Sequence, residues 1–353
     1  MLRSHVISTP RATSIGGPAV CTNFRLTAQD SSIVVGRTME FPNLMGAKIT
    51  VLPRGFAGAG IAASGAGKTW TAEYGVVGVD AFGQPGWLTD GINEKGVYAG
   101  LLYMPGFCDY TPAEGKDPAA CMSIVNTVAY VLGNCASVAE ATAAMAEVTV
   151  WPWTVQGFGN APSSHLILHD ASGASAVIEW RDGDMVIFDN PIGVATNSPH
   201  LDWHLLNLRN YLTLQARNPG PVTIAGVQIP VFGQGSGMRG LPADGSGPSR
   251  FVRAVAYVAT LRPGPDAAEL ERSALHVLNN FDIPLGTVRA DDDPDGDDHT
   301  LWSTISNLTD RRYAIRSYDN PTPQVIDLAS TDFTPGEPRQ VPLSSGSFAA
   351  LAV

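Results

Sequence analysis

Glycine and proline interrupt this chain throughout its length, with 37 glycines and 26 prolines among 353 residues. Both residues favour turns and break helices, so they limit how far any helix or strand can run. Because 44% of the residues are apolar and only 16% are charged, the chain can still bury a core of good size. Short strands joined by many turns are therefore expected, rather than a helical bundle.

Between these turns the apolar residues recur with strand or helix periodicity. Ser137 and Glu140 have the spacing of a capping box, whereas Asp90, Gly91 and Asn93 are typical of a turn. Strands are expected at 33–39, 47–52, 74–79, 97–103, 165–169, 176–180, 185–188, 301–307, 312–318 and 323–328, and helices at 119–132, 137–147, 201–216, 250–261 and 266–280. Strands gather toward both ends with helices between them. This order predicts an α+β fold with two antiparallel sheets covered by helices, and residues 21–353 are expected to form one domain.

The charge and cysteine content exclude several classes of protein. The formal net charge is −11, which argues against partners such as nucleic acids or anionic membrane surfaces. No run of 18 apolar residues is present to span a bilayer. The four cysteines form no CxxC pair and are too few for a disulfide framework. An acidic globular enzyme is the expectation.

Residues 1–20 are rich in Ser, Thr, Pro, Gly and Arg. They lack the apolar stretch of a signal peptide, so we expect a cytoplasmic protein; an export signal further upstream would instead make it periplasmic or secreted. Two interpretations of this segment remain open. It is either a frayed tail or a leader that ends just before Cys21.

Two other segments resemble ligand-binding motifs only in part. Residues 64–69 (SGAGKT) match the end of a phosphate loop, but Ala62 stands where that loop needs glycine. Residues 291–296 (DDDPDG) match the first half of a calcium loop, but Trp302 stands where the bidentate glutamate belongs. The acidic run 291–298 is expected to be an exposed loop, and calcium binding there stays a minor alternative. His204, early in an expected helix, is interpreted as a packing or capping residue. No metal or organic cofactor is predicted.

Cys21 begins a series of short motifs in a fixed order. After Cys21 come the segments 36–40 (GRTME), 90–96 (DGINEKG), 102–106 (LYMPG), 196–199 (TNSP), 207–211 (NLRNY) and 248–253 (PSRFVR). The series resembles the choloylglycine hydrolase family, which contains penicillin V acylases, conjugated bile-salt hydrolases and acyl-homoserine-lactone acylases. The resemblance extends from Cys21 to about Leu328. Several motifs in order over that length are far more specific than any one of them.

The resemblance implies the four-layer αββα fold of N-terminal-nucleophile hydrolases. It also implies that Cys21 becomes the amino-terminal nucleophile once a leader of residues 1–20 is removed, with Arg37 beside its thiol. Glu40 stands where the family more often has aspartate, so its side chain reaches one methylene further as a partner for the new amino terminus.

The remaining site residues are implied in the same way. Asn197 would donate a hydrogen bond to the oxyanion, together with the backbone N–H of Tyr103, and Arg250 would complete the charged ring. Tyr103 falls where the acylases have tyrosine and the bile-salt enzymes have asparagine. The resemblance also suggests that the chain forms a homo-oligomer, specifically a tetramer.

An amino-terminal cysteine explains these residue types chemically. Only the thiolate attacks well, and a free thiol has a pKa of about 8.5. The α-amino group, with a pKa of about 7.7–8.0, is partly neutral near pH 7 and takes the thiol proton. One residue therefore supplies nucleophile and base, and Arg37 and Arg250 favour the thiolate by charge. The expected reaction is hydrolysis of a linear, non-peptide amide through a thioester.

Three alternatives remain for the substrate and the activity. Tyr103 and the segment 151–153 (WPW) favour a small-molecule amide with an aryl or fatty acyl group, as in penicillin V or acyl-homoserine lactones. A conjugated bile salt is the second possibility. The third is a relative that never matures and binds its ligand without cleaving it.

Overall fold

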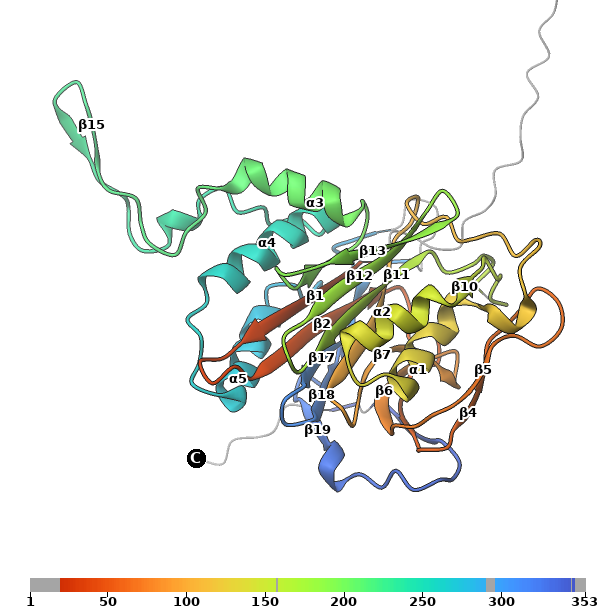
Figure 1. The fold of residues 1–353 in the computed structure, drawn as a ribbon. Helices are drawn as coiled ribbons and strands as arrows, with labels where there is room; N and C mark the ends of the chain where they lie inside the picture. Colours follow the sequence, from red (N-terminus) through yellow and green to blue (C-terminus); the bar gives the residue numbers. More distant parts are fainter. Residues whose placement is uncertain (1–19, 157, 290–295, 344, 347–353) are drawn as a thin grey trace, which may run out of the picture.

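Two antiparallel sheets form the centre of the molecule (Figure 1), which is a computed structural model that describes residues 20–156, 158–289, 296–343 and 345–346. Sheet A has the strand order β14 (Val194–Ala195), β1 (Cys21–Thr27), β2 (Ile33–Phe41), β17 (His299–Asn307), β18 (Arg312–Ser317) and β19 (Gln324–Asp327). Sheet B has the order β13 (Asp184–Asp189), β12 (Ser175–Arg181), β11 (Ser164–Asp170), β8 (Val97–Tyr103), β7 (Gln84–Asn93), β6 (Val76–Ala81), β3 (Lys48–Leu52) and β20 (Arg339–Pro342).

Helices cover the outer face of each sheet. The helices α1 (Ile124–Asn134) and α2 (Val138–Ala146) pack on sheet B, whereas α4 (Gly247–Thr260) and α5 (Ala267–Leu278) pack on sheet A (Figure 1). A short helix, α3 (Leu201–Asn207), packs against α4. The order helix, sheet, sheet, helix confirms the predicted α+β, four-layer αββα architecture.

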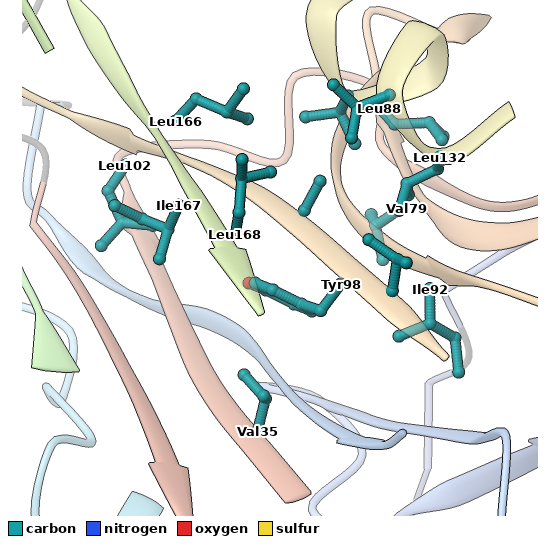
Figure 2. Packing of buried hydrophobic residues seen from close by; sticks show 14 of the residues in the cluster. Val35, Val79, Leu88, Ile92, Tyr98, Leu102, Leu132, Leu166, Ile167 and Leu168 are labelled. Atoms are coloured by element: carbon teal, nitrogen blue, oxygen red, sulfur yellow. The ribbon is translucent and has the colours of Figure 1, made fainter. Parts of the chain in front are cut away.

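Strand β2 shows why this stacking suits the sequence. All of its residues are buried because sheet B covers one face of the strand and α5 covers the other. Its side chains therefore alternate between two interiors. Val35, Arg37 and Met39 face sheet B, where Figure 2 shows Val35 near Tyr98 and Leu168. On the helical side Phe24 of β1 lies across Gly36, where a Cβ would overlap its ring.

Most of the predicted elements are present, but three were placed wrongly. Residues 84–93 form strand β7, so Asp90 and Gly91 lie inside a strand rather than in a turn. The first predicted helix begins at Ile124, after Ser123 caps it. The helix predicted at 201–216 ends at Asn207 and is followed by one 3₁₀ turn, because only Leu201 and His204 of α3 are buried and none of residues 208–216 is.

The error at β7 has a physical cause. Asn93 resembles a turn residue but is buried, and its side-chain amide donates to the carbonyls of Leu132 and Cys135. Its side-chain oxygen accepts from the backbone N–H groups of Lys95 and Val97, so it stabilises the real turn just beyond the strand. Buried polar residues in a strand thus imitate the sequence of a surface turn.

Short elements lie outside the two large sheets. They are the strand pairs β4 (Ala57–Ala59) with β5 (Thr69–Thr71), β9 (Cys121–Met122) with β10 (Thr149–Val150), and β15 (Val222–Ile224) with β16 (Val227–Ile229). The β15–β16 hairpin projects away from the layers (Figure 1). Residues 64–69 lead into β5 and not into a helix, so they do not form a phosphate loop. All four cysteines are free. Within the described ranges, no helix has the length and apolar character needed to cross a membrane.

Candidate active site

Cys21 is the first residue of β1 and is buried between the two sheets. Its backbone N–H donates to Asn197 Oδ1 at 2.7 Å, and its carbonyl accepts from the guanidinium of Arg250. The preceding residue, Val20, is also buried, and its carbonyl accepts from the backbone N–H of Glu40 at 3.0 Å. The peptide bond between residues 20 and 21 is therefore held firmly within the site.

Arg37 of β2 lies beside the thiol, as expected. Its Nη2 atom is 4.0 Å from Cys21 Sγ and 3.1 Å from Met39 Sδ, and it donates to the carbonyl of Leu101. Its Nη1 atom is 3.5 Å from Asp90 Oδ1 of sheet B, with both side chains fully buried. Although burial lowers the pKa of Arg37, the Asp90 carboxylate raises it above its ordinary value, so the guanidinium stays charged.

Asp90 is a partner that the sequence analysis missed. Its carboxylate also accepts from Thr304 Oγ1 at 2.8 Å and from the hydroxyl of Tyr313 at 3.2 Å, both on sheet A. Asp90 was assigned to a turn because Asp-Gly is a common turn sequence. One signal was available: a lone arginine in the apolar strand 33–41 needs a carboxylate from another buried strand.

Asn197 connects the other candidate residues. Its Nδ2 atom donates to the carbonyl of Tyr103 at 2.6 Å, and its Oδ1 atom accepts from Cys21 and from Arg250. This orientation of the amide is chemically required, since a carbonyl only accepts and a guanidinium only donates. The Nδ2 atom retains a second N–H for an oxyanion.

Arg250, in the first turn of α4, binds the backbone of Cys21 rather than its thiol. In addition to Cys21 and Asn197, it donates to Thr22 Oγ1 at 2.8 Å and to the carbonyl of Gly245 at 2.9 Å. Burial lowers the pKa of Arg250, and the nearby charge of Glu40 acts in the opposite direction. Arg250 therefore closes the charged ring from the helical side of sheet A.

Glu40 occupies the face of β2 opposite to Arg37. Its Oε1 atom accepts from Thr300 Oγ1 at 2.9 Å, and its Oε2 atom has no hydrogen-bond partner among the described residues. Burial raises the pKa of Glu40 to about 7, although Arg250 lowers it. The Glu40 carboxyl therefore keeps its proton to a higher pH than an ordinary glutamate does.

The thiol of Cys21 is influenced by opposing effects. Burial raises its pKa, while Arg37, a hydrogen bond from the backbone of Tyr103 and Arg250 lower it, and Glu40 raises it further. Burial outweighs the rest, so the pKa is raised overall. The two arginines act in the expected direction, but with Val20 attached Cys21 has no amino group to accept its proton.

An apolar pocket opens beside the thiol. It encloses about 80 Å³, and Tyr103 at the end of β8 forms one wall, with Phe41 and Phe158 in edge contact with its ring. The lining residues are Cys21, Met39, Glu40, Phe41, Met45, Ala81, Phe82, Trp87, Leu88, Thr89, Leu101, Tyr103, Val125, Phe158, Pro162 and Ser164.

The segment 151–153 does not line this pocket, contrary to expectation. Trp153 packs edge-on against Trp87, which does line it, at a centroid distance of 5.6 Å. Trp151 instead donates its indole N–H to the carbonyl of Ile61. Trp153 therefore supports the pocket from behind, through Trp87.

Two other candidate sites contain none of these residues. A larger cavity of about 290 Å³ lies among Pro284, Thr300, Arg316 and Tyr318, and no candidate catalytic residue lines it. The calcium-like segment falls largely on residues 290–295, outside the described residues. Elsewhere in the described chain, no group of three or more His, Cys, Asp or Glu side chains is placed to hold a metal ion.

Comparisons with known proteins identify the family of this chain. A family model for linear amide C–N hydrolases of the choloylglycine hydrolase family matches residues 21–339. The bile salt hydrolase/transferase of Clostridium perfringens is 29% identical over 316 residues, covering 88% of this chain and 92% of the relative. The penicillin V acylase of Pectobacterium atrosepticum is 30% identical over 325 residues, covering 86% of this chain and 78% of the relative. Among solved structures, a variant of the conjugated bile acid hydrolase of Clostridium perfringens has a TM-score of 0.80 at 27% identity, covering 92% of this chain and 99% of that one.

Proposed function

Because the chain belongs to the choloylglycine hydrolase family of linear amide C–N hydrolases, we propose that Cys21 is its nucleophile, freed as the amino terminus when residues 1–20 are removed. The observation that carries this proposal is the convergence of Asn197 and Arg250 on the backbone of Cys21, at the first position of β1. Hydrogen bonds to the backbone of the nucleophile, rather than only to its thiol, suit a residue whose nitrogen takes part in the chemistry.

In the proposed reaction, Cys21 Sγ attacks the carbonyl carbon of the amide. The thiol proton passes to the α-amino group of Cys21 and then to the leaving amine, as the C–N bond breaks and a thioester forms. Water then attacks the thioester, the acid is released and the thiol recovers its proton. The second N–H of Asn197 and the backbone N–H of Tyr103 stabilise the oxyanion in both steps.

The charged residues have separate roles in this proposal. Arg37, held by Asp90, favours the thiolate from within the sheets. Arg250 fixes the carbonyl of Cys21 and the amide of Asn197. Glu40, whose Oε2 atom is unpartnered among the described residues, balances these cations and is available to the new amino group.

The pocket supports an acylase acting on a small apolar or aromatic acyl group. A drug-sized ligand usually fills a pocket of about 300–1,000 Å³, and this cavity of about 80 Å³ is far smaller. A single ring or short chain therefore fits better than the fused rings of a bile acid. Penicillin V and acyl-homoserine lactones are the proposed substrate types, and conjugated bile salts are the alternative.

A substrate panel tests the activity and its specificity. The test measures kcat/KM for penicillin V, N-octanoyl-homoserine lactone and glycocholate. The highest value should belong to one of the first two, and Cys21→Ser should reduce each value by at least 100-fold. Preference for glycocholate would support the bile-salt alternative. Turnover that persists in Cys21→Ser would exclude Cys21 as nucleophile.

Intact mass and N-terminal sequencing separate the enzyme from a non-maturing binding protein. A purified chain that begins at Cys21 would support the hydrolase. Retention of residues 1–20 after long incubation, together with ligand binding and no turnover, would support the binding protein.

The β15–β16 hairpin supports a further part of the proposal, assembly into a homo-oligomer. Val222 pairs with Ile229 and Ile224 with Val227, so these four exposed apolar side chains share one face of the hairpin. Thr223 and Gln228 occupy the other face. A two-stranded hairpin alone is marginally stable in water, and a second subunit would cover its apolar face.

A further inference from the structure

The Asn197 segment lies between β14 and α3, and its backbone carbonyls are held by side chains rather than by a strand ladder. The Thr196 carbonyl is 2.9 Å from Nε2 of His165, on β11, and the Asn197 carbonyl is 2.9 Å from Nε2 of His204, on α3. Because a carbonyl only accepts, Nε2 must carry the proton in both imidazoles.

These two hydrogen bonds act on the two peptide planes that flank Asn197. The carbonyl of Thr196 belongs to the plane before its Cα, and the carbonyl of Asn197 belongs to the plane after it. Fixing both planes fixes φ and ψ of Asn197, so that only its side-chain torsions remain free. Further bonds from Thr196 Oγ1 to the Gly247 carbonyl (3.0 Å) and from Ser198 Oγ to the Pro105 carbonyl (2.7 Å) secure the segment.

The two histidines are themselves firmly placed. His165 is buried on β11 with its Nδ1 atom 3.8 Å from Glu179 Oε1, beyond hydrogen-bond distance, and that carboxylate oxygen accepts from the N–H of Leu201 at the start of α3. His204 stacks on Phe251, the neighbour of Arg250 in α4, at 4.6 Å between ring centroids. Burial lowers the pKa of His204 to about 4, so its ring is neutral at physiological pH. Strand β11 and helices α3 and α4 therefore meet at the segment that carries Asn197.

We propose that His165 and His204 are positioning residues for the oxyanion donor Asn197. The inference rests on the proposed function, because Asn197 needs precise placement only if an oxyanion forms beside Cys21. An amide donor stabilises an oxyanion well when it is preorganised within about 0.5 Å of its productive position. Neither histidine exchanges a proton with the substrate; each acts through one peptide plane.

The test uses matched substitutions at His204. His204→Phe keeps the stacked ring and removes the donor, whereas His204→Gln keeps a donor at the position of Nε2 and removes the ring. His169→Phe is the control, because this buried histidine lies on the same strand as His165 but bonds Asn23 and not the Asn197 segment. We expect His204→Phe and His165→Phe to lower kcat 10- to 100-fold at nearly unchanged KM. His204→Gln should recover much of that loss, and His169→Phe should stay within about threefold of wild type at an equal folded fraction.

A second readout isolates the oxyanion site. Phenoxyacetaldehyde forms a tetrahedral adduct with the Cys21 thiol, whereas phenoxyacetic acid occupies the pocket without one. His204→Phe should weaken aldehyde affinity by the same factor as kcat and leave acid affinity unchanged. Aldehyde affinity equal to wild type in His204→Phe, or an equal kcat loss in His169→Phe, would overturn the positioning roles alone. A wild-type protein that binds the aldehyde no better than the acid would contradict the proposed function and this inference together.

Discussion

The amide of Asn197 is shared among three partners before any substrate arrives. It accepts from Cys21 and Arg250, donates to Tyr103 and retains one N–H. A side chain held by so many fixed groups has little freedom to lose in the transition state, which is the condition under which an oxyanion donor is most effective. Its contribution should therefore appear in kcat more than in KM.

The first prediction concerns this residue. Asn197→Ala should lower kcat by about 10²–10³, the usual loss when one oxyanion donor is removed, with KM changing much less. Steady-state kinetics on the fully processed protein measure both. The variant should stay folded by circular dichroism, because the β14 and α4 contacts of the segment remain. A kcat within threefold of wild type would remove Asn197 from the proposed oxyanion site.

The second prediction concerns the buried carboxyl of Glu40. Its pKa is raised to about 7 by burial, so between pH 4.5 and 7 the native state holds a proton that the unfolded state has released. Stability must then fall as pH rises through this interval, by about 1.4 kcal/mol for each pH unit at most. Burial likewise raises the pKa of Asp298 to about 7, so two groups contribute to the same fall.

Thermal unfolding between pH 4.5 and 8 tests this prediction. The comparison is made in a Cys21→Ala background, in which Val20 stays attached to residue 21. Glu40→Gln should flatten the decline in Tm by roughly half, and the double variant Glu40→Gln, Asp298→Asn should nearly remove it. An unchanged decline in both variants would show that neither carboxyl holds its proton above pH 4.5.

The candidate residues differ in how far the sequence alone could identify them. Cys21, Arg37, Glu40, Tyr103, Asn197 and Arg250 were singled out by ordered motifs, and the structure brings them together around one thiol. Asp90 and His165 act through partners far away in the chain, which no local pattern contains, whereas His204 contacts the carbonyl of Asn197, seven residues before it. His204 was expected to be a packing residue; it is indeed buried, and it also holds a carbonyl.

At the scale of elements, the contact between β2 and β7 joins the two sheets at the site. Arg37 and Asp90 are both fully buried, so each depends on the other to compensate for lost hydration. Removing one partner of such a pair leaves an unpaired buried charge. Replacing both with apolar residues removes the charge and the need for a partner together.

The third prediction follows from this pair. Asp90→Asn should lower the free energy of unfolding by about 3–5 kcal/mol and should also reduce kcat, since Arg37 loses its anchor. The double variant Arg37→Met, Asp90→Leu should recover most of the stability and remain inactive. Urea unfolding and kinetics on both variants make the comparison. A loss below 1 kcal/mol in Asp90→Asn would indicate that the pair does not hold the sheets together.

The elements were predictable where a local pattern determined them. The α2 helix begins as its capping box indicates, with Ser137 accepting from the N–H of Glu140, and the β11–β12 hairpin lies where alternation placed it. Strand β7 was missed, because its polar residues are satisfied across the core and imitate a turn. The predicted helix at 201–216 was too long, because periodicity cannot tell whether a neighbouring surface exists to bury the later turns.

At the scale of the whole molecule, the β15–β16 hairpin is the part that the four layers do not explain (Figure 1). Its apolar face has no covering element among the residues that the structure describes, whereas its opposite face is polar. This asymmetry provides the basis for a sharp test of assembly, because neighbouring residues of one strand point to opposite faces.

The fourth prediction uses that alternation. Ile224→Asp places a charge on the apolar face and should shift the protein toward monomers, whereas Thr223→Asp, one residue away on the polar face, should leave the oligomer intact. Light scattering coupled to size-exclusion chromatography measures the mass of each. A wild-type protein that is monomeric at 50 μM would contradict the proposed assembly. Equal masses for the two variants would show that this face is not the contact.

The position of the Cys21 thiol between two sheets also affects how we expect activity to be lost under stress. Cys21 and Arg37 belong to sheet A, while Asp90 and Tyr103 belong to sheet B. Any swelling of the interior that moves the layers apart separates the nucleophile from its supporting groups while every strand ladder is still intact. We therefore expect turnover to disappear at a lower urea concentration than the one at which the far-ultraviolet circular dichroism signal is lost. Activity would then report the separation of the two sheets before the secondary structure unfolds.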